Sequence, residues 1–172
     1  GYLATSGMPV WLVIPVTTLF GALIGAFNGW GYNRFKLEPF IITLASMSIF
    51  RGLGYILCGG KPVFINNPDF TSIGSTRIVW FMTIPVIVLL IAFVIFAILL
   101  NKTRFGRSIY VLGGNKYAAR LAGLNPAMIT TVLFMISGAL SALGGGLLAA
   151  RMQSSQPSSC EGLEFDAITA VV

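Results

Sequence analysis

Apolar runs long enough to cross a lipid bilayer recur along this chain. No charged residue occurs between Gly1 and Asn33, and Val10 to Trp30 would make a helix of roughly 31 Å, about the thickness of the hydrocarbon core. Three more apolar runs are of comparable length: Pro39 to Leu57, Ile78 to Leu100 and Met128 to Ala150. A fifth apolar run begins near Ala167. The runs predict an all-α, polytopic transmembrane helix bundle with about four complete spans plus the start of a fifth.

The composition argues against a soluble protein and against an enzyme. Only 9% of the residues are charged and 56% are hydrophobic, whereas a globular domain carries about 25% charge. The chain has no histidine, and its two cysteines, Cys58 and Cys160, do not have metal-ligand spacing. We therefore expect no metal and no nucleophile–base pair. The net charge of +6 is typical of membrane-protein loops rather than of nucleic-acid binding.

The distribution of Lys and Arg predicts the orientation in the membrane. If the first span runs from outside to inside, seven basic residues fall in cytoplasmic loops: Arg34, Lys36, Lys102, Arg104, Arg107, Lys116 and Arg120. The outer segments then hold three basic residues, together with Asp69, Glu161, Glu164 and Asp166. This asymmetry follows the positive-inside rule.

Small residues at every fourth position indicate where helices pack closely. The first span has Gly21, Gly25 and Gly29. The fourth has two rows, one of Ser137, Ser141, Gly145 and Ala149 and one of Gly138, Ala142, Gly146 and Ala150. Packing is the expected role, with a pore-lining role for Gly144-Gly145-Gly146 as the alternative. The third span lacks such a stripe and is expected to face lipid.

Two polar connections stand out. The outer loop from Gly59 to Thr76 is rich in turn residues, and either a function or simple solvation explains it. Asn101 to Pro126 predicts a turn at Gly113-Gly114, an N-cap at Asn115, a short helix over Lys116 to Ala122 and a left-handed stop at Gly123. Such a short helix needs a partner. We expect Ala118, Ala119 and Ala122 to be exposed for docking; the alternative is an inert loop on the membrane surface.

Four blocks along the chain together resemble a known family. The first reads Phe105-Gly106-Arg107-Ser108-Ile109-Tyr110, Gly113-Gly114-Asn115 and Ala118-Ala119-Arg120-Leu121-Ala122-Gly123-Leu124-Asn125. The others are Asn28-Gly29, Pro39-Phe40-Ile41-Ile42-Thr43-Leu44 with Arg51-Gly52-Leu53, and Ser154 to Pro157 with Gly162-Leu163-Glu164-Phe165-Asp166-Ala167-Ile168. Their order and spacing resemble the ribose/xylose/galactose-type ABC importer permeases, over nearly the whole chain.

The resemblance implies a multi-pass permease subunit of the bacterial inner membrane that translocates a simple sugar. It implies one transmembrane domain over residues 1–172, truncated at both ends, with a cytoplasmic coupling loop over residues 101–127. The implied partners are a second permease subunit, identical or related, a cytoplasmic ABC ATPase and a periplasmic sugar-binding protein. The chain has no GxxxxGK[ST] phosphate loop, so we expect ATP and Mg²⁺ on the ATPase and no cofactor here.

There are two groups of candidate site residues: an ATPase-coupling group, which the resemblance implies, and a path group, chosen because small polar side chains suit a neutral sugar. The ATPase-coupling group comprises Gly114, Asn115, Ala118, Ala119, Arg120, Leu121 and Gly123. For the translocation path we single out Thr43, Ser46, Arg51 and Ser137. Arg51 is the one charge within an apolar run, which favours pairing inside the bundle over sugar contact. Two alternatives stay open: another cargo on the same scaffold, namely a branched-chain amino acid or a signalling furanose, and a passive or secondary carrier.

Overall fold

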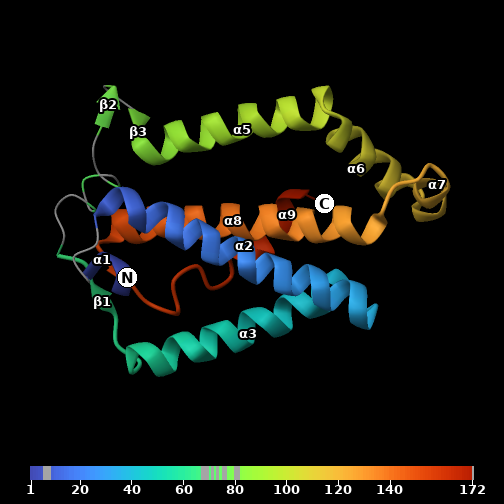
Figure 1. Cartoon of the computed structure of the whole chain (residues 1–172). Coiled ribbons are helices and arrows are strands. Elements are labelled where there is room, and N and C mark those ends of the chain that lie inside the picture. Colours follow the sequence, from blue (N-terminus) through green and yellow to red (C-terminus); the bar gives the residue numbers. More distant parts are fainter. Residues whose placement is uncertain are drawn as a thin grey trace.

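The computed structural model describes residues 1–5, 9–66, 70, 72, 74, 77–79 and 82–171. Four long helices lie side by side in it: α2 (Val10–Phe35), α3 (Pro39–Cys58), α5 (Ile84–Lys102) and α8 (Pro126–Met152) (Figure 1). All four are long and apolar enough to cross a membrane, which confirms the predicted all-α polytopic bundle. The shorter helices are α1 (Tyr2–Thr5), α6 (Arg104–Gly114), α7 (Lys116–Leu121) and α9 (Leu163–Val171).

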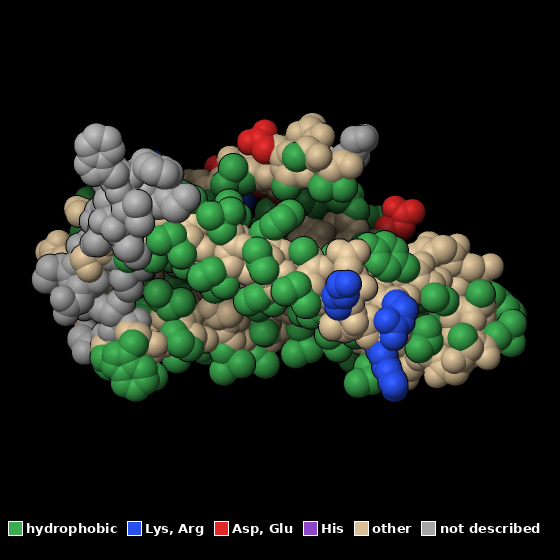
Figure 2. Space-filling model, turned by 90° about the horizontal axis from the view of Figure 1, so that it is seen from above, with side chains coloured by type: hydrophobic (Ala, Val, Ile, Leu, Met, Phe, Trp, Pro, Cys, Tyr) green, Lys and Arg blue, Asp and Glu red, His purple; other side chains and the backbone are tan. Residues whose placement is uncertain are grey.

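The long helices alternate in direction between two ends of the bundle (Figure 1). At one end, the strand end, β1 (Val63–Phe64) pairs antiparallel with β4 (Ser154–Ser155), and β2 (Arg77–Val79) with β3 (Met82–Thr83). The other end, the basic end, carries all seven basic residues predicted for the cytoplasmic loops. In Figure 2 the Lys and Arg side chains on the visible face gather toward this end, and hydrophobic side chains cover much of the rest.

Several boundaries differ from the predicted ones for local reasons. The third span begins at Ile84 rather than Ile78, because Thr83 is extended and Pro85 occupies the first helical turn. The fourth begins at Pro126, because the Asn125 side chain accepts hydrogen bonds from the backbone of the first turn. α9 begins at Leu163, ahead of Ala167.

The outer loop forms a tight turn directly after α3. Gly59 and Gly60 have φ of 58° and 72°, in the left-handed region that glycine tolerates. Gly74 lies against the backbone of Ala150 and Arg151 in α8. The predicted turn signals at Asn67, Pro68 and Thr76 lie outside the described residues.

The packed centre of the bundle is the contact between α2 and α8, the most extensive one in the described part of the chain. No side chain larger than the hydrogen of glycine fits at three positions of α2 where it crosses α8. A Cβ on Gly25 would meet the carbonyl group of Phe134, a Cβ on Gly21 would meet Gly138 and Ala142, and a Cβ on Gly29 would lie 2.7 Å from Thr131 Cα. The Gly21, Gly25 and Gly29 stripe is therefore a packing surface, as predicted.

Polar and aromatic contacts extend the same pairing toward the basic end. Asn33 Nδ2 donates to Ala127 O at 3.0 Å and to Thr131 Oγ1 at 2.9 Å. The rings of Tyr32 and Phe134 lie 6.0 Å apart. Interhelical hydrogen bonds of this kind add to helix association in lipid, where apolar contact alone gives little preference.

The two small-residue rows of α8 have different surroundings. Gly138 and Ala142 face α2, as expected of a packing row. Ser137, Ser141 and Gly145 are exposed within the described chain, so nothing in this chain covers their row, and its expected packing role stays a prediction. No residue of α5 is buried, in agreement with its predicted outward-facing position.

An ion pair joins α3 to the segment that follows α8. Arg51 NH1 lies 3.5 Å from Glu161 Oε1, and the Arg51 side chain is 23% exposed. Arg51 lies about two turns inside α3, roughly 10 Å before the helix ends at Cys58. Glu161 therefore lies beside the last two turns of α3. The reason is that the chain folds back after α8 (Figure 1).

Replacing Gly25 by Leu is expected to separate α2 from α8, because the added side chain meets the Phe134 backbone, which cannot move aside cheaply. Overpacking costs about 1–3 kcal/mol, and we expect the upper part of that range. Thermal unfolding of the full-length protein in detergent measures the loss. Gly52→Leu is the control, because no atom lies within 4 Å of a Cβ there; equal melting temperatures for the two variants would contradict the tight crossing.

Glu161→Gln is expected to leave Arg51 without its partner and to lower stability by about 1 kcal/mol, the upper end for partly exposed pairs. The double reversal Arg51→Glu with Glu161→Arg should recover part of the loss, as measured by thermal unfolding. Asp166→Asn, a change at an exposed acid on α9, serves as the control. Failure of the double reversal to improve on either single reversal would argue against the pair.

Candidate functional site

A helix that the sequence did not predict leads to the candidate site at the basic end. α6 starts at Arg104, because Thr103 Oγ1 accepts a hydrogen bond from Gly106 N at 3.1 Å. It runs through Gly114, so the predicted turn at Gly113-Gly114 is wrong. The helix continues because Phe105, Ile109 and Leu112 form one apolar face that packs against the following residues.

The short helix α7 has the predicted start and stop. Asn115 Oδ1 accepts from Tyr117 N at 2.8 Å and from Ala118 N at 3.2 Å, which is N-cap geometry. Gly123 has φ of 76°, and Leu124 N donates to Ala119 O at 3.0 Å just beyond it. The helix ends by turning into the left-handed region, where glycine carries no steric penalty.

One side of α7 is buried in a small apolar cluster. Ala119 is 0% exposed and forms this cluster with Leu112 of α6 and Ile129 of α8, while Phe105, Ile109, Leu124 and Leu133 pack around it. The expectation that Ala119 is exposed for docking is therefore wrong. The alanine is small because it lies under two neighbouring helices, and it holds α7 in place.

The opposite side of α7 is exposed and partly apolar. Tyr117 and Leu121 are 76% and 85% exposed, and Ala118, Arg120 and Ala122 are exposed as well. Lys116 and Arg120 add two positive charges to this surface, which we call the α7 face: residues 116, 117, 118, 120, 121 and 122. Exposed apolar side chains rimmed by charge mark surfaces that other proteins cover.

The α7 face is tied to the central helix pair. Lys116 Nζ donates to the Tyr32 hydroxyl at 2.6 Å and lies 5.4 Å from the centre of the Tyr32 ring. Tyr32 in turn packs on Phe134 of α8. A displacement of α7 is thus passed to both α2 and α8 by direct contact.

The seven residues predicted for ATPase coupling lie together. Gly114 and Asn115 form the junction between α6 and α7, Ala118, Arg120 and Leu121 lie on the exposed side, Ala119 lies beneath, and Gly123 ends the helix. The structure thus assembles one continuous surface from them, apart from the buried Ala119.

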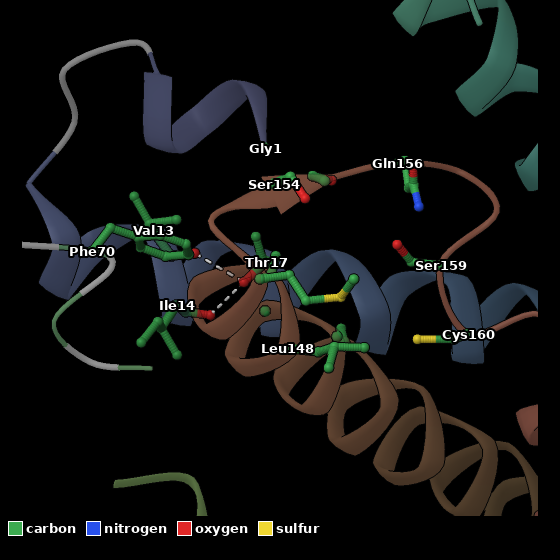
Figure 3. Close-up of a pocket in the computed structure, with 16 residues that line it drawn as sticks. Gly1, Val13, Ile14, Thr17, Phe70, Leu148, Ser154, Gln156, Ser159 and Cys160 are labelled. Atoms are coloured by element: carbon green, nitrogen blue, oxygen red, sulfur yellow. Dashed lines mark hydrogen bonds between the residues drawn. The ribbon is translucent and has the colours of Figure 1, made fainter. Parts of the chain in front are cut away.

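The residues predicted for the path do not converge. Thr43 and Ser46 hydrogen-bond to backbone carbonyls within α3, and Ser46 is buried. Arg51 pairs with Glu161, and Ser137 lies exposed on α8. A cavity of about 300 Å³ lies elsewhere, between α2, α8 and the segment after α8 near the strand end (Figure 3). Gly145 and Gly146 line it, whereas none of the four predicted path residues does.

Sequence reasoning missed Tyr32 and the apolar face of α6. Phe105, Ile109 and Leu112 follow the i, i+4, i+7 spacing of a helix face, which was the available signal. No comparable signal marked Tyr32, because its role depends on Lys116, far away in sequence.

The whole chain, residues 1–172, matches the family described as branched-chain amino acid transport system / permease component. The ribose import permease protein RbsC of Haemophilus influenzae is 40% identical over 169 residues, which cover 96% of this chain and 52% of the relative. RbsC of Bacillus subtilis is 41% identical over 84% of this chain and 45% of the relative. The L-arabinose transport system permease protein AraH of Escherichia coli is 41% identical over 84% and 44%.

The chain spans about half the length of these relatives. No solved structure matches it. The family match covers every residue of the chain, including the α6–α7 segment and the segment after α8. The chain therefore belongs to the family of permease components of the branched-chain amino acid transport system type.

Proposed function

We propose that this chain forms the membrane-spanning part of a permease subunit that moves a monosaccharide across the membrane in an ATP-driven ABC importer. The chain lies in the bacterial inner membrane as a multi-pass protein. The observation that carries the proposal is identity of 40–41% to permeases named for ribose and arabinose, over 84% or more of this chain. The proposal puts ATP hydrolysis on a separate subunit, since this chain contains no phosphate-binding loop.

The α7 face is the proposed docking surface for a cytoplasmic ABC ATPase. It lies at the basic end, which the positive-inside rule puts in the cytoplasm. Tyr117 and Leu121 expose apolar area that becomes favourable when a groove covers it. The cluster around Ala119 supports this face from below, so docking does not require α7 to fold at that moment.

Movement of the ATPase would reach the membrane through two contacts. One is the apolar cluster of Leu112, Ala119 and Ile129, and the other is the Lys116 to Tyr32 hydrogen bond. Both end on α2 or α8, which are packed too tightly to slide independently. The proposed result is rocking of this pair as one body between inward-open and outward-open states.

The proposal includes further partners. A second permease subunit, identical or related, would complete the pore; the exposed row of Ser137 and Ser141 offers surface for it. A periplasmic sugar-binding protein would deliver the sugar at the strand end. ATP and Mg²⁺ belong on the ATPase, and this chain is proposed to bind no cofactor.

The second candidate is a different cargo on the same scaffold. The family description favours a branched-chain amino acid, and a signalling furanose belongs to the same alternative. A passive pore or a secondary carrier would need no ATPase. Uptake measurements separate these functions.

Cells that express the full-length permease with its ATPase and binding protein are expected to accumulate labelled D-ribose or L-arabinose. ATP depletion should abolish this uptake, because the energy enters through the ATPase. Labelled L-leucine is the matched cargo control. Uptake of leucine in place of either sugar would favour the amino acid alternative, and sugar uptake that survives ATP depletion would favour a carrier.

Leu121→Asp is expected to reduce sugar uptake at least tenfold, because it puts a charge at the centre of the apolar docking surface, where about 1.4 kcal/mol corresponds to each factor of ten. Membrane insertion and melting temperature should stay unchanged, since Leu121 is exposed. The measurements are uptake and co-purification of the ATPase. Leu121→Met, which keeps the apolar contact, is the control; full uptake and normal ATPase recovery in Leu121→Asp would disprove docking at this face.

A further inference from the structure

The segment after α8 leaves the strand end and turns back along the bundle. α8 ends at Met152; the next residue, Gln153, has φ of 53°, and its carbonyl oxygen accepts a hydrogen bond from Ile65 N at 2.9 Å. Ser154 and Ser155 then pair with Phe64 and Val63. From there the chain runs back past α3 and on to α9 (Figure 1).

Two contacts with α3 show how far the segment after α8 runs back along that helix. Pro157 packs at the position of Gly54, where an added Cβ would lie 3.6 Å from Pro157 Cβ. Glu161 pairs with Arg51 at 3.5 Å. Since α3 ends at Cys58, these contacts lie about 6 and about 10 Å inside the span at 1.5 Å per residue. The residues between Gln153 and Gly162 therefore form a non-helical, polar stretch beside the last two turns of α3.

Non-helical backbone at membrane depth is tolerated only where protein or water surrounds it. Here one side faces the cavity of about 300 Å³. Four polar side chains line it from this segment, and none of them hydrogen-bonds to another group in the part of the chain that the structure describes: Ser154, Ser155, Gln156 and Ser159. Leaving such groups dry costs several kcal/mol each, on the order of 2–7. A polar molecule in the cavity would give these four side chains hydrogen-bond partners.

The lining matches a neutral, hydroxyl-rich molecule. Serine hydroxyls and the Gln156 amide both donate and accept hydrogen bonds, as sugar hydroxyls do. Val13, Ile14 and Leu148 supply apolar surface on the other side, and Figure 3 shows Gln156, Ser159 and Cys160 across from Thr17 and Leu148. No acidic or basic side chain lines the cavity in the described chain, so the lining side chains offer hydrogen bonds rather than charge. The volume is at the lower end of ligand sites, about 300–1,000 Å³.

We propose that this cavity is a monosaccharide-binding subsite on the route inward from the strand end, built by the polar segment of residues 154–160 against α2 and α8. The inference rests on the proposed function, because it assigns the sugar a place within the same permease. The uncharged side chains of the lining favour a neutral polyol over a zwitterionic amino acid.

Cys160 provides a native probe of the cavity. It is a free, exposed cysteine that lines the cavity. In the full-length permease with its partner subunits, Cys58→Ser and serine in place of any cysteine outside this chain leave Cys160 as the single thiol. We expect a membrane-impermeant methanethiosulfonate reagent, added from the outside, to label Cys160. D-ribose or L-arabinose should slow the labelling several-fold, and L-leucine should not.

Two adjacent glycines give a matched pair of filling variants. Gly145 lines the cavity and Gly144 does not, and neither has an atom within 4 Å of an added Cβ. Gly145→Leu should fit into the fold, fill the cavity, slow Cys160 labelling and reduce sugar uptake several-fold. Gly144→Leu should change neither.

The outcomes separate this subsite from the wider function. If the unsubstituted protein shows ATP-dependent sugar uptake but sugar does not protect Cys160, or Cys160 does not react at all, the subsite is wrong and the permease function stands. Equal loss of uptake in Gly144→Leu and Gly145→Leu also overturns the subsite. If sugar is neither taken up nor able to protect Cys160 from labelling, both proposals fail. If L-leucine alone protects Cys160, the cavity binds an amino acid and the sugar subsite is wrong.

Discussion

Two helices in this bundle approach so closely that hydrogen is the largest side chain that fits between them. Lipid tails are as apolar as leucine, so helices in a bilayer gain little from hiding apolar surface and associate through close backbone contact and hydrogen bonds. Gly21, Gly25 and Gly29 provide the close contact, and Asn33 provides the hydrogen bonds to α8. The other long helices are more peripheral: α3 is held partly by one ion pair, and α5 has no buried residue.

The two functional surfaces lie at opposite ends of this packed pair. The α7 face adjoins the first turns of α8, and the cavity adjoins its last turns, with a helix of 27 residues, about 40 Å long, between them. A tightly packed pair of helices moves as one body, because there is no free space between the two helices where they cross. The arrangement thus suits the proposed mechanism, in which movement of α7 at the basic end changes access at the strand end.

The sequence was most informative where a single local rule decides the structure. The spans follow from apolar run length, the α7 cap from Asn115, and the α7 stop from Gly123. It was less informative where a contact joins distant segments. Nothing local distinguishes Ala118 from Ala119, yet one is exposed and the other lies beneath Leu112 and Ile129. Similarly, Arg51 was expected to have a partner, but the choice of Glu161 depends on the fold-back after α8.

The amino-acid pattern alone established that this is a polytopic membrane protein with a basic end, a glycine-lined helix and a short capped helix between two spans. These features depend on residues close together along the chain. They can be predicted because the transfer of apolar side chains from water to lipid and the steric limits of the backbone act on neighbouring residues. The three-dimensional packing established which small-residue row of α8 meets α2, which face of α7 is free, and how residues 153–162 come to line a cavity. Those outcomes depend on side chains that meet only after the helices have assembled. The periodicity of the sequence does not show which of these side chains will be in contact.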